Sequence, residues 1–484
     1  IWVVLASLLP AAFGGAALAL LSARPRGPAD WIWLGAAGWL LAILALGACL
    51  PLLPIAPSSA FAWLAPVLLV LSILLAALAR RRWAGAIAAE ANPVEVTMKA
   101  PAGRGSWHSR WLPLLALALA IQFVLILHQA LWTPSYPWDA WTVWLLRARA
   151  WLEADAFLPV LGLQDWLATR VPALPTIAPD YPNAVPGIAV WFGSAAGGWN
   201  SVAVHAAWPL AWLAGALAMW SGLLRAGVGC RVAELGCFAW ASLPMLSAHA
   251  ALAGYADLWV GLLLMLAGLS ALQLGQAARR RGALLVLLLS ILLLPMVKLE
   301  GWIWAGVALS ILSFALLPRR GRRIAAALLA LGALLALLLL VLVPLQLMVP
   351  GLGEFRIGEG ALALGPIQAQ FQPQNVLPEL LWTLFVLPHW HLLWLLLPVL
   401  LALGWRRGVQ QGGLPAGAAG LALGALLGLA FLVLVFGFSQ HAQWLRDLTS
   451  INRLLLQWLP LQLLLAAWLW RASPVASAPS VKGD

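Results

Sequence analysis

The stretch that decides the fold begins TPSYPWDAWTVWLLRARAWLEADAF at residues 133–157 and ends APDYPN at residues 178–183. It lies between long apolar segments, yet charges gather in it, although only 9% of the chain is charged. These charged residues are Asp139, Arg147, Arg149, Glu153, Asp155, Asp165, Arg170 and Asp180, with Trp138, Trp141, Trp144 and Trp151 between them. Tryptophan favours the membrane–water boundary, where its ring is apolar and its N–H is hydrated. We therefore interpret the stretch as a polar platform on one face of a membrane domain.

Composition outside this stretch predicts an all-α, polytopic transmembrane helical bundle. The 484 residues are 63% hydrophobic, with a mean hydropathy of +0.94, far above the apolar share of about 45–50% in soluble domains. The net charge of +12 is not a signal for nucleic acid, because the basic residues form short clusters between apolar runs, as topology determinants do. The three cysteines show no spacing for a disulfide framework or a metal site.

The apolar runs predict about thirteen spans, each near the ~20 residues that a crossing helix needs. We place them at 2–22, 31–54, 60–79, 111–131, 201–224, 233–250, 258–277, 283–298, 302–317, 324–349, 381–404, 415–438 and 453–471. The first run is expected to be a helix rather than a signal peptide. The shorter apolar piece 184–199 is expected not to cross the membrane, as a re-entrant or interfacial helix.

The Lys and Arg clusters set the predicted orientation, since basic loops stay in the cytoplasm. The loop 132–200, with its helical segments, then faces outward, as do the loops at 254–257, 298–301, 350–380 and 439–452. The predicted organisation is an N-terminal three-helix segment at 1–79, a basic cytoplasmic linker at 80–110, a catalytic membrane domain at 111–471 and a cytoplasmic tail at 472–484.

Ionisable groups at the outward ends of spans are costly unless they are paired or functional. Asp139 is either the N-cap of the helix that follows it or a catalytic base. Arg147 is eight residues further on, about two helical turns, so it is expected on the same face, pairing with Asp139 or binding an anionic group. Asp180 and Tyr181 precede Pro182 and are either a plain turn or part of the site.

Three further positions leave a structural and a functional reading open. Asp257 starts a predicted helix and is either a simple cap or a site residue. Lys298 and Glu300 are expected to pair with each other or with other groups of that face. Arg453 either snorkels to the interface or binds a phosphate. His249 is expected to be an interior histidine. His389 and His391 are weak evidence for a metal, so a divalent cation has no motif behind it.

These residues resemble motifs of the GT-C superfamily of integral-membrane glycosyltransferases, notably bacterial relatives of protein O-mannosyltransferase and the aminoarabinose transferase. The matching elements are Asp139 in the first large loop, the Asp180–Pro182 segment, Gly254 and Asp257 in GYADLW, Lys298 with Glu300 and Gly301, and Ser450 with Arg453. The similarity covers about 111–471. Two departures are that Ala140 follows Asp139 where many members have a second acid, and that GYADLW holds a single acid.

The resemblance implies a polyprenyl-phosphate-linked sugar as donor, a glycan, lipid or protein as acceptor, and a site on the periplasmic face of a bacterial inner membrane. Asp139 would be the catalytic base, and Arg453, Lys298 and Arg147 would bind the donor phosphate. The predicted substrate contacts are Asp180, Tyr181, Asp257, Glu300, Trp138 and Trp141. Alternatives are a lipid-linked glycan polymerase or ligase, a flippase-type transporter, and a non-catalytic assembly subunit.

Overall fold

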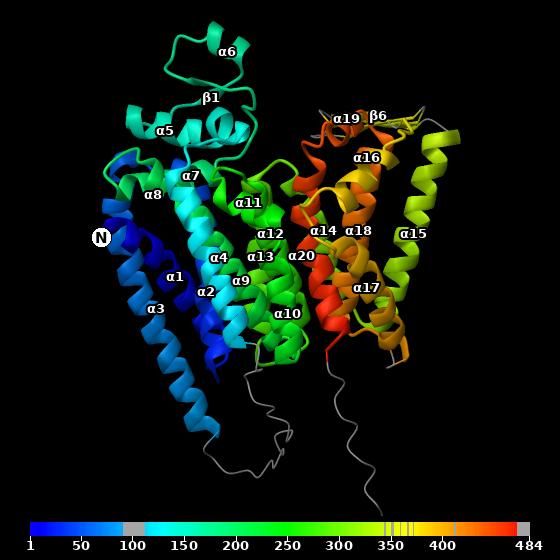
Figure 1. The fold of residues 1–484 in the computed structure, drawn as a ribbon, viewed down its shortest axis with the longest axis horizontal. Helices are drawn as coiled ribbons and strands as arrows, with labels where there is room; N and C mark the ends of the chain where they lie inside the picture. The colour runs from blue at the N-terminus through cyan, green and yellow to red at the C-terminus, as the bar shows by residue number, and fades with distance from the viewer. Residues whose placement is uncertain are drawn as a thin grey trace, which may run out of the picture.

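The computed structural model describes residues 1–90, 112–342, 345–349, 353–358, 360–364, 367–370, 372–410 and 413–471. The structure is 76% helical with almost no sheet, and most of its helices run side by side in one bundle (Figure 1). Seven helical segments in the described part are long and apolar enough to cross a membrane. They are Trp2–Leu21, Pro28–Leu52, Pro57–Gly85, Leu112–Trp132, Ser201–Arg225, Arg280–Val297 and Ala416–Phe438. The helical class is confirmed, and these segments agree with a multi-pass membrane bundle.

The first three helices pack against the helices that follow them. They are α1 (Trp2–Leu21), α2 (Pro28–Cys49) and α3 (Ala60–Glu90), with single 3-10 turns η1 (Leu50–Leu52) and η2 (Pro57–Ser59) between the last two. Helix α2 contacts α7 (Ala184–Ala195) and α9 (Ala207–Arg225). The indole N–H of Trp191 in α7 donates to the backbone carbonyl of Ala6 over 2.9 Å. The N-terminal helices therefore pack against α7, the short helix that follows residues 133–183, which we call the Trp-rich stretch.

The Trp-rich stretch forms a small layer above one end of the bundle (Figure 1). It follows α4 (Leu112–Trp132) and consists of the π-helical turn η3 (Ala140–Trp144), α5 (Leu145–Ala154), the paired two-residue strands β1 (Val160–Leu161) and β2 (Leu174–Pro175), and α6 (Leu163–Ala168). The twelve residues of α7 come next and are all buried. Since twelve residues rise only about 18 Å, α7 is too short to cross a bilayer.

A fully buried helix lies at the centre of the bundle. The helices here are α8 (Ser201–His205), α9, α10 (Cys230–Ala241), α11 (Pro244–Ala251), α12 (Asp257–Gln273), α13 (Arg280–Val297) and α14 (Gly301–Leu316). Every residue of α12 is buried, and it contacts α9, α13, α14 and the last helix, α20 (Ile451–Leu469). An all-round apolar helix is expected in such a central place. Polar groups at its two ends are consequently held close to its neighbours.

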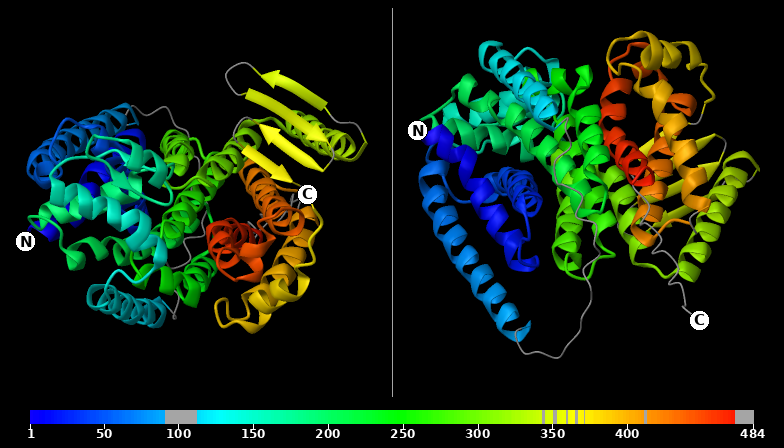
Figure 2. Two further views of the ribbon diagram at one scale, coloured as in Figure 1. Left: turned by 90° about the horizontal axis from the view of Figure 1, so that it is seen from above. Right: turned by 60° about the horizontal axis from the view of Figure 1, so that its bottom comes forward.

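The C-terminal part adds helices and one antiparallel sheet. Its elements are α15 (Arg319–Leu342), β3 (Leu345–Val349), β4 (Gly353–Gly358), β5 (Ala361–Leu364), β6 (Ile367–Gln370), α16 (Leu377–Leu381), the π-helical turn η4 (Trp382–Val386), α17 (Leu393–Gln410), α18 (Ala416–Phe438), α19 (Ala442–Arg446) and α20. The strands pair in chain order and lie at the edge of the molecule beside α15 (Figure 2).

Several predicted spans differ from the observed elements. The span expected at 233–250 is two helices, because Pro244 starts α11 as its first residue and lacks the N–H that would continue α10. The span expected at 324–349 ends in β3, and the one at 381–404 becomes a regular α-helix only at Leu393. Apolar composition alone does not separate these conformations.

The boundaries of the predicted linker also change. Helix α3 continues to Glu90, so the first part of the expected linker 80–110 is helical. Its remainder from residue 91 and the expected tail 472–484 lie outside the described residues. The described part of the predicted outward loop at 350–380 contains β4, β5 and β6, three of the four strands of the antiparallel sheet.

Candidate functional site

Five charged side chains from distant parts of the chain meet at one end of the bundle. We call them the charge cluster: Asp139, Asp257, Lys298, Glu300 and Arg453. Asp139 immediately precedes η3, Asp257 begins α12, Lys298 and Glu300 lie between α13 and α14, and Arg453 lies in the first turn of α20. Sequence reasoning had named all five but could not show that they touch.

Asp257 is the centre of the charge cluster. Its side chain is 0% exposed, and its two oxygens receive three donors. Oδ1 accepts from the Lys298 ammonium over 2.9 Å and from the Gln457 amide over 2.5 Å, while Oδ2 accepts from Arg453 Nε over 2.8 Å. A buried carboxylate requires such partners. The N-cap of α12 is Ala256, and Asp257 is the first helical residue; its oxygens bind side chains of other elements, so Asp257 is not a simple helix cap.

Arg453 joins two carboxylates. Its Nε binds Asp257, and its Nη2 binds Asp139; its guanidinium also lies 5.3 Å from the centre of the Tyr255 ring. A guanidinium fork suits this bridging geometry. Arg453 is therefore a paired residue of the cluster and not an arginine that snorkels freely to the interface.

Asp139 and Glu300 form the accessible edge of the cluster. Their side chains are 21% and 30% exposed, against 4% for Lys298. Asp139 is the residue before η3 but makes no side-chain cap hydrogen bond. Glu300 Oε1 lies 3.0 Å from the Lys298 ammonium, as predicted for this pair, while its Oε2 is buried without a partner in the described structure. A substrate approaching from this end would meet Asp139 and Glu300 before Asp257.

Two glycines permit the close packing that assembles the cluster. Gly254 has a φ of 115°, and a Cβ added there would lie 2.2 Å from the Cβ of Ala140. Only glycine combines this backbone conformation with such a close approach. A Cβ on Gly301 would likewise lie 1.9 Å from the Leu294 carbonyl oxygen. The first glycine brings the residue after Asp139 against the turn that precedes Asp257.

Arg147 does not pair with Asp139, contrary to the sequence prediction. It is 1% exposed, and its guanidinium donates to the backbone carbonyls of Ala178 and Tyr181 and, over 3.0 Å, to Asn183 Oδ1. The reason is local: η3 is π-helical, so its wider turns displace the two-turn register assumed for a regular helix. Arg147 instead fixes the segment that carries Tyr181.

Burial and neighbouring charges shift the pKa values of Arg147 and Tyr181. Burial lowers the pKa of the Arg147 guanidinium to about 10, and the charge of exposed Asp180 opposes that shift. Burial raises the pKa of the Tyr181 phenol, and the nearby carboxylate of Glu300 raises it further. The Tyr181 ring stacks on Trp144 with 5.1 Å between centroids. Tyr181 thus lies near the charge cluster, whereas the charge of Asp180 acts on Arg147.

The remaining predicted site residues differ in their setting. Trp138 and Trp141 are 61% and 48% exposed and meet edge to face at 4.7 Å, which leaves their surfaces available. His249 is buried, as expected, and packs on Tyr255 at 4.5 Å. His391 Nε2 lies 3.3 Å from the Ser242 carbonyl oxygen. Among the described residues no three His, Cys, Asp or Glu side chains are grouped to hold a metal ion.

One member of this network was missed from the sequence. Gln457 binds Asp257 through its amide nitrogen and accepts the indole N–H of Trp304 through its oxygen. The available signal was its position four residues after Arg453 in an apolar helix, which places both side chains on one face.

Comparisons with known proteins do not identify the chain. No model of a known protein family matches it, and searches of curated proteins and of solved structures give no match.

Proposed function

We propose that the chain is a membrane glycosyltransferase that transfers a sugar from a polyprenyl-phosphate-linked donor to an acceptor hydroxyl. The observation that carries the proposal is the bridge that Arg453 makes between Asp139 and Asp257. It joins an accessible carboxylate to a guanidinium at the end of a bundle of apolar helices. The GT-C-like motifs supply the expectation of a sugar donor, and their meeting in one cluster supports it.

In the proposed reaction, Asp139 activates the acceptor, and Arg453 and Lys298 stabilise the leaving phosphate. The Asp139 carboxylate accepts the proton of the acceptor hydroxyl as its oxygen attacks the anomeric carbon. The bond from that carbon to the phosphate oxygen breaks, and the polyprenyl phosphate leaves with an additional negative charge. Arg453 and Lys298 are the fixed cations that stabilise this charge. Arg147 was expected to bind the donor phosphate too, but its contacts with loop carbonyls assign it to positioning the Tyr181 segment.

The ion pair between Arg453 and Asp139 gives the site an order of events. In the structure, the Asp139 carboxylate pairs with Arg453 Nη2. A donor phosphate that binds Arg453 competes with that carboxylate for the guanidinium. Asp139 is then released from its counter-charge, which makes it a stronger base at the moment when the acceptor arrives. Asp257 keeps Arg453 in place throughout, because it holds the other side of the guanidinium.

Asp139→Asn tests the base directly. The full chain in nanodiscs is given short-chain polyprenyl-phosphate sugars and candidate acceptors, and donor binding and release of polyprenyl phosphate are measured separately. Donor binding is expected to be retained or to tighten, because the phosphate no longer competes with a carboxylate for Arg453, while transfer falls by roughly 100-fold or more, as for loss of a general base. Asp165→Asn is the matched control, since Asp165 is exposed in the same loop. Undiminished transfer by Asp139→Asn would exclude this mechanism.

Arg453→Lys and Arg453→Ala test the phosphate role. Lysine keeps the charge but loses the fork, so donor binding is expected to weaken by about tenfold, and further in the alanine variant. If wild type binds no polyprenyl-phosphate sugar, the donor assignment fails. A change in the leaflet exposure of the lipid without any transfer product would instead indicate a flippase, and growth of a lipid-linked chain would indicate a polymerase.

A further inference from the structure

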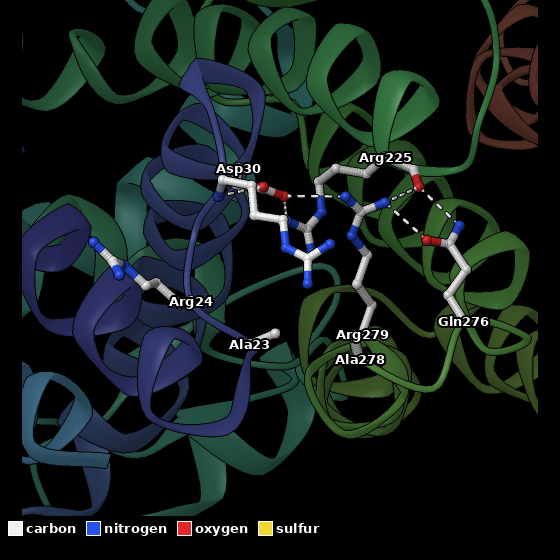
Figure 3. Close-up of a pocket in the computed structure, with 8 residues that line it drawn as sticks. Ala23, Arg24, Asp30, Arg225, Gln276, Ala278 and Arg279 are labelled. Atoms are coloured by element: carbon white, nitrogen blue, oxygen red, sulfur yellow. Dashed lines mark hydrogen bonds and ion pairs between the residues drawn. The ribbon is translucent and has the colours of Figure 1, made fainter. Parts of the chain in front are cut away.

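A second polar cluster lies at the opposite end of α12 and α13. It lines a pocket of about 140 Å³ between the ends of α1 and α9 and the starts of α2 and α13 (Figure 3). We call it the arginine pocket; its lining residues are Ala23, Arg24, Arg26, Asp30, Arg225, Gln276, Ala278 and Arg279. Because α12 has 17 residues, about 25 Å of helix separates this pocket from the charge cluster.

The single carboxylate of the arginine pocket is already occupied. Asp30 Oδ1 binds Arg225 Nη1 and lies 3.5 Å from Arg279 Nη2, and Oδ2 accepts the backbone N–H of Arg26 over 2.9 Å. Figure 3 shows Arg225 and Arg279 on one side of Asp30 and Arg24 on the other. Four arginines therefore line a pocket that holds one carboxylate, and only the guanidinium groups of Arg225 and Arg279 pair with it, which leaves a surplus of positive charge.

The surplus is carried by groups with free donors. The side chains of Arg24 and Arg26 are exposed, and neither donates a hydrogen bond to any residue in the described ranges. Arg225, by contrast, is buried and fixed by Asp30 and by Gln273 Oε1 over 3.0 Å. Arg279 folds back onto the Arg225 carbonyl and the Gln276 side chain. Arg225 and Arg279 are therefore fixed by hydrogen bonds inside the pocket. Arg24 and Arg26 are exposed beside them, and their guanidinium N–H groups can bind an anion.

We propose that the arginine pocket binds the phosphate of an anionic phospholipid headgroup. Guanidinium groups bind phosphate oxygens with charge-assisted, paired hydrogen bonds. Basic pockets between helix ends on the cytoplasmic side are suited to lipid headgroups, and the distribution of Lys and Arg assigns this end to the cytoplasm. Topology alone requires only exposed basic residues, such as Arg319 and Arg320; it does not require a pocket with a buried, carboxylate-fixed arginine.

The experiment uses the full chain purified in detergent without phosphate. A fluorescent short-chain phosphatidylglycerol is titrated into wild type, Arg24→Gln/Arg26→Gln and the control Arg319→Gln/Arg320→Gln, and phosphatidylcholine and inorganic phosphate are used as competitors. The control removes two exposed arginines from the same predicted side of the membrane. Phosphatidylglycerol is expected to bind wild type and to bind the Arg24/Arg26 variant about tenfold more weakly, since charge-assisted contacts are lost. The control is expected to stay within about twofold because Arg319 and Arg320 do not line the pocket.

Three outcomes decide the proposal. Equal weakening in both double variants would show a diffuse basic surface and overturn the pocket. Equal binding of phosphatidylcholine would overturn the requirement for an anionic headgroup. Binding of inorganic phosphate without binding of phosphatidylglycerol would keep the phosphate site but overturn its lipid source. None of these results depends on glycosyl transfer, so failure of the proposed function and failure of this site are distinguishable.

Discussion

The charge cluster and the arginine pocket lie at the two ends of the same pair of helices, α12 and α13, but they are built differently. In the charge cluster three carboxylates face two cations, and the central carboxylate is 0% exposed. In the arginine pocket one carboxylate pairs with two of four arginines, and the other two, Arg24 and Arg26, are exposed. In the first arrangement every charged side chain has a partner of opposite sign, with one carboxylate in excess, whereas in the second the side chains of Arg24 and Arg26 have no carboxylate partner among the described residues.

The two arrangements suit two different roles, the positioning of side chains and the binding of an external anion. A cluster whose ions all have internal partners can hold side chains in fixed positions and release one carboxylate when an anion competes for its cation. An unbalanced pocket retains affinity for an anion from outside. Both arrangements carry the desolvation cost of charged groups, but the charge cluster depends more strongly on each internal partner. Three substitutions measure how far this contrast holds.

Asp257→Asn is expected to have the largest effect on stability. It would leave Lys298 and Arg453 without their shared, fully buried counter-charge, so the free energy of unfolding should fall by about 3–5 kcal/mol. Chemical unfolding in detergent micelles, followed by tryptophan fluorescence, measures the change. A loss as small as that of an exposed carboxylate would mean that the charge cluster is not held by Asp257.

Asp30→Asn is expected to have an intermediate effect. The Asp30 side chain is 11% exposed, an asparagine oxygen can still accept the Arg26 N–H, and Arg225 keeps Gln273. We expect a loss of about 1.5–3 kcal/mol in the same unfolding assay, the range for a hydrogen bond to a charged group. If this loss equals that of Asp257→Asn, the two clusters do not differ in their dependence on a central acid.

Arg149→Ala is expected to have the smallest effect and sets the baseline. Arg149 and Glu153 form a pair four residues apart on α5, with side chains 58% and 56% exposed. Such exposed pairs contribute about 0.3–0.5 kcal/mol. The unfolding assay should barely detect the change, and donor binding should not move. A large effect here would show that the Trp-rich layer depends on surface charge more than its buried Arg147 contacts indicate.

Much of the fold could be predicted from the sequence because apolar runs of spanning length have few other stable forms. The runs at 2–22, 31–54, 201–224 and 415–438 correspond to long apolar helices in the structure. The predictions failed where composition gives no preference. The largely apolar segment LQLMV at 345–349 is a strand, and the break at Pro244 required knowing where α10 could no longer continue.

The residues of the candidate site were more predictable than their contacts. Charges in apolar surroundings single out Asp139, Asp257 and Arg453, since membrane segments tolerate few of them. Their partners depended on packing. The π-helical turn after Asp139 removed Arg147 from its expected partner, and Gln457 gained importance only through its contact with Asp257.

The sequence by itself determined the helical membrane class, the approximate limits of many helices and the list of unusual charges, because these follow from local composition and from the high energy of charge in an apolar medium. Only the tertiary structure decided which charges meet. Asp139 and Arg453 are 314 residues apart, and no local pattern links them. Their ion pair exists because Gly254 lets the Trp-rich layer approach the turn before α12, and because α12 and α20 pack side by side.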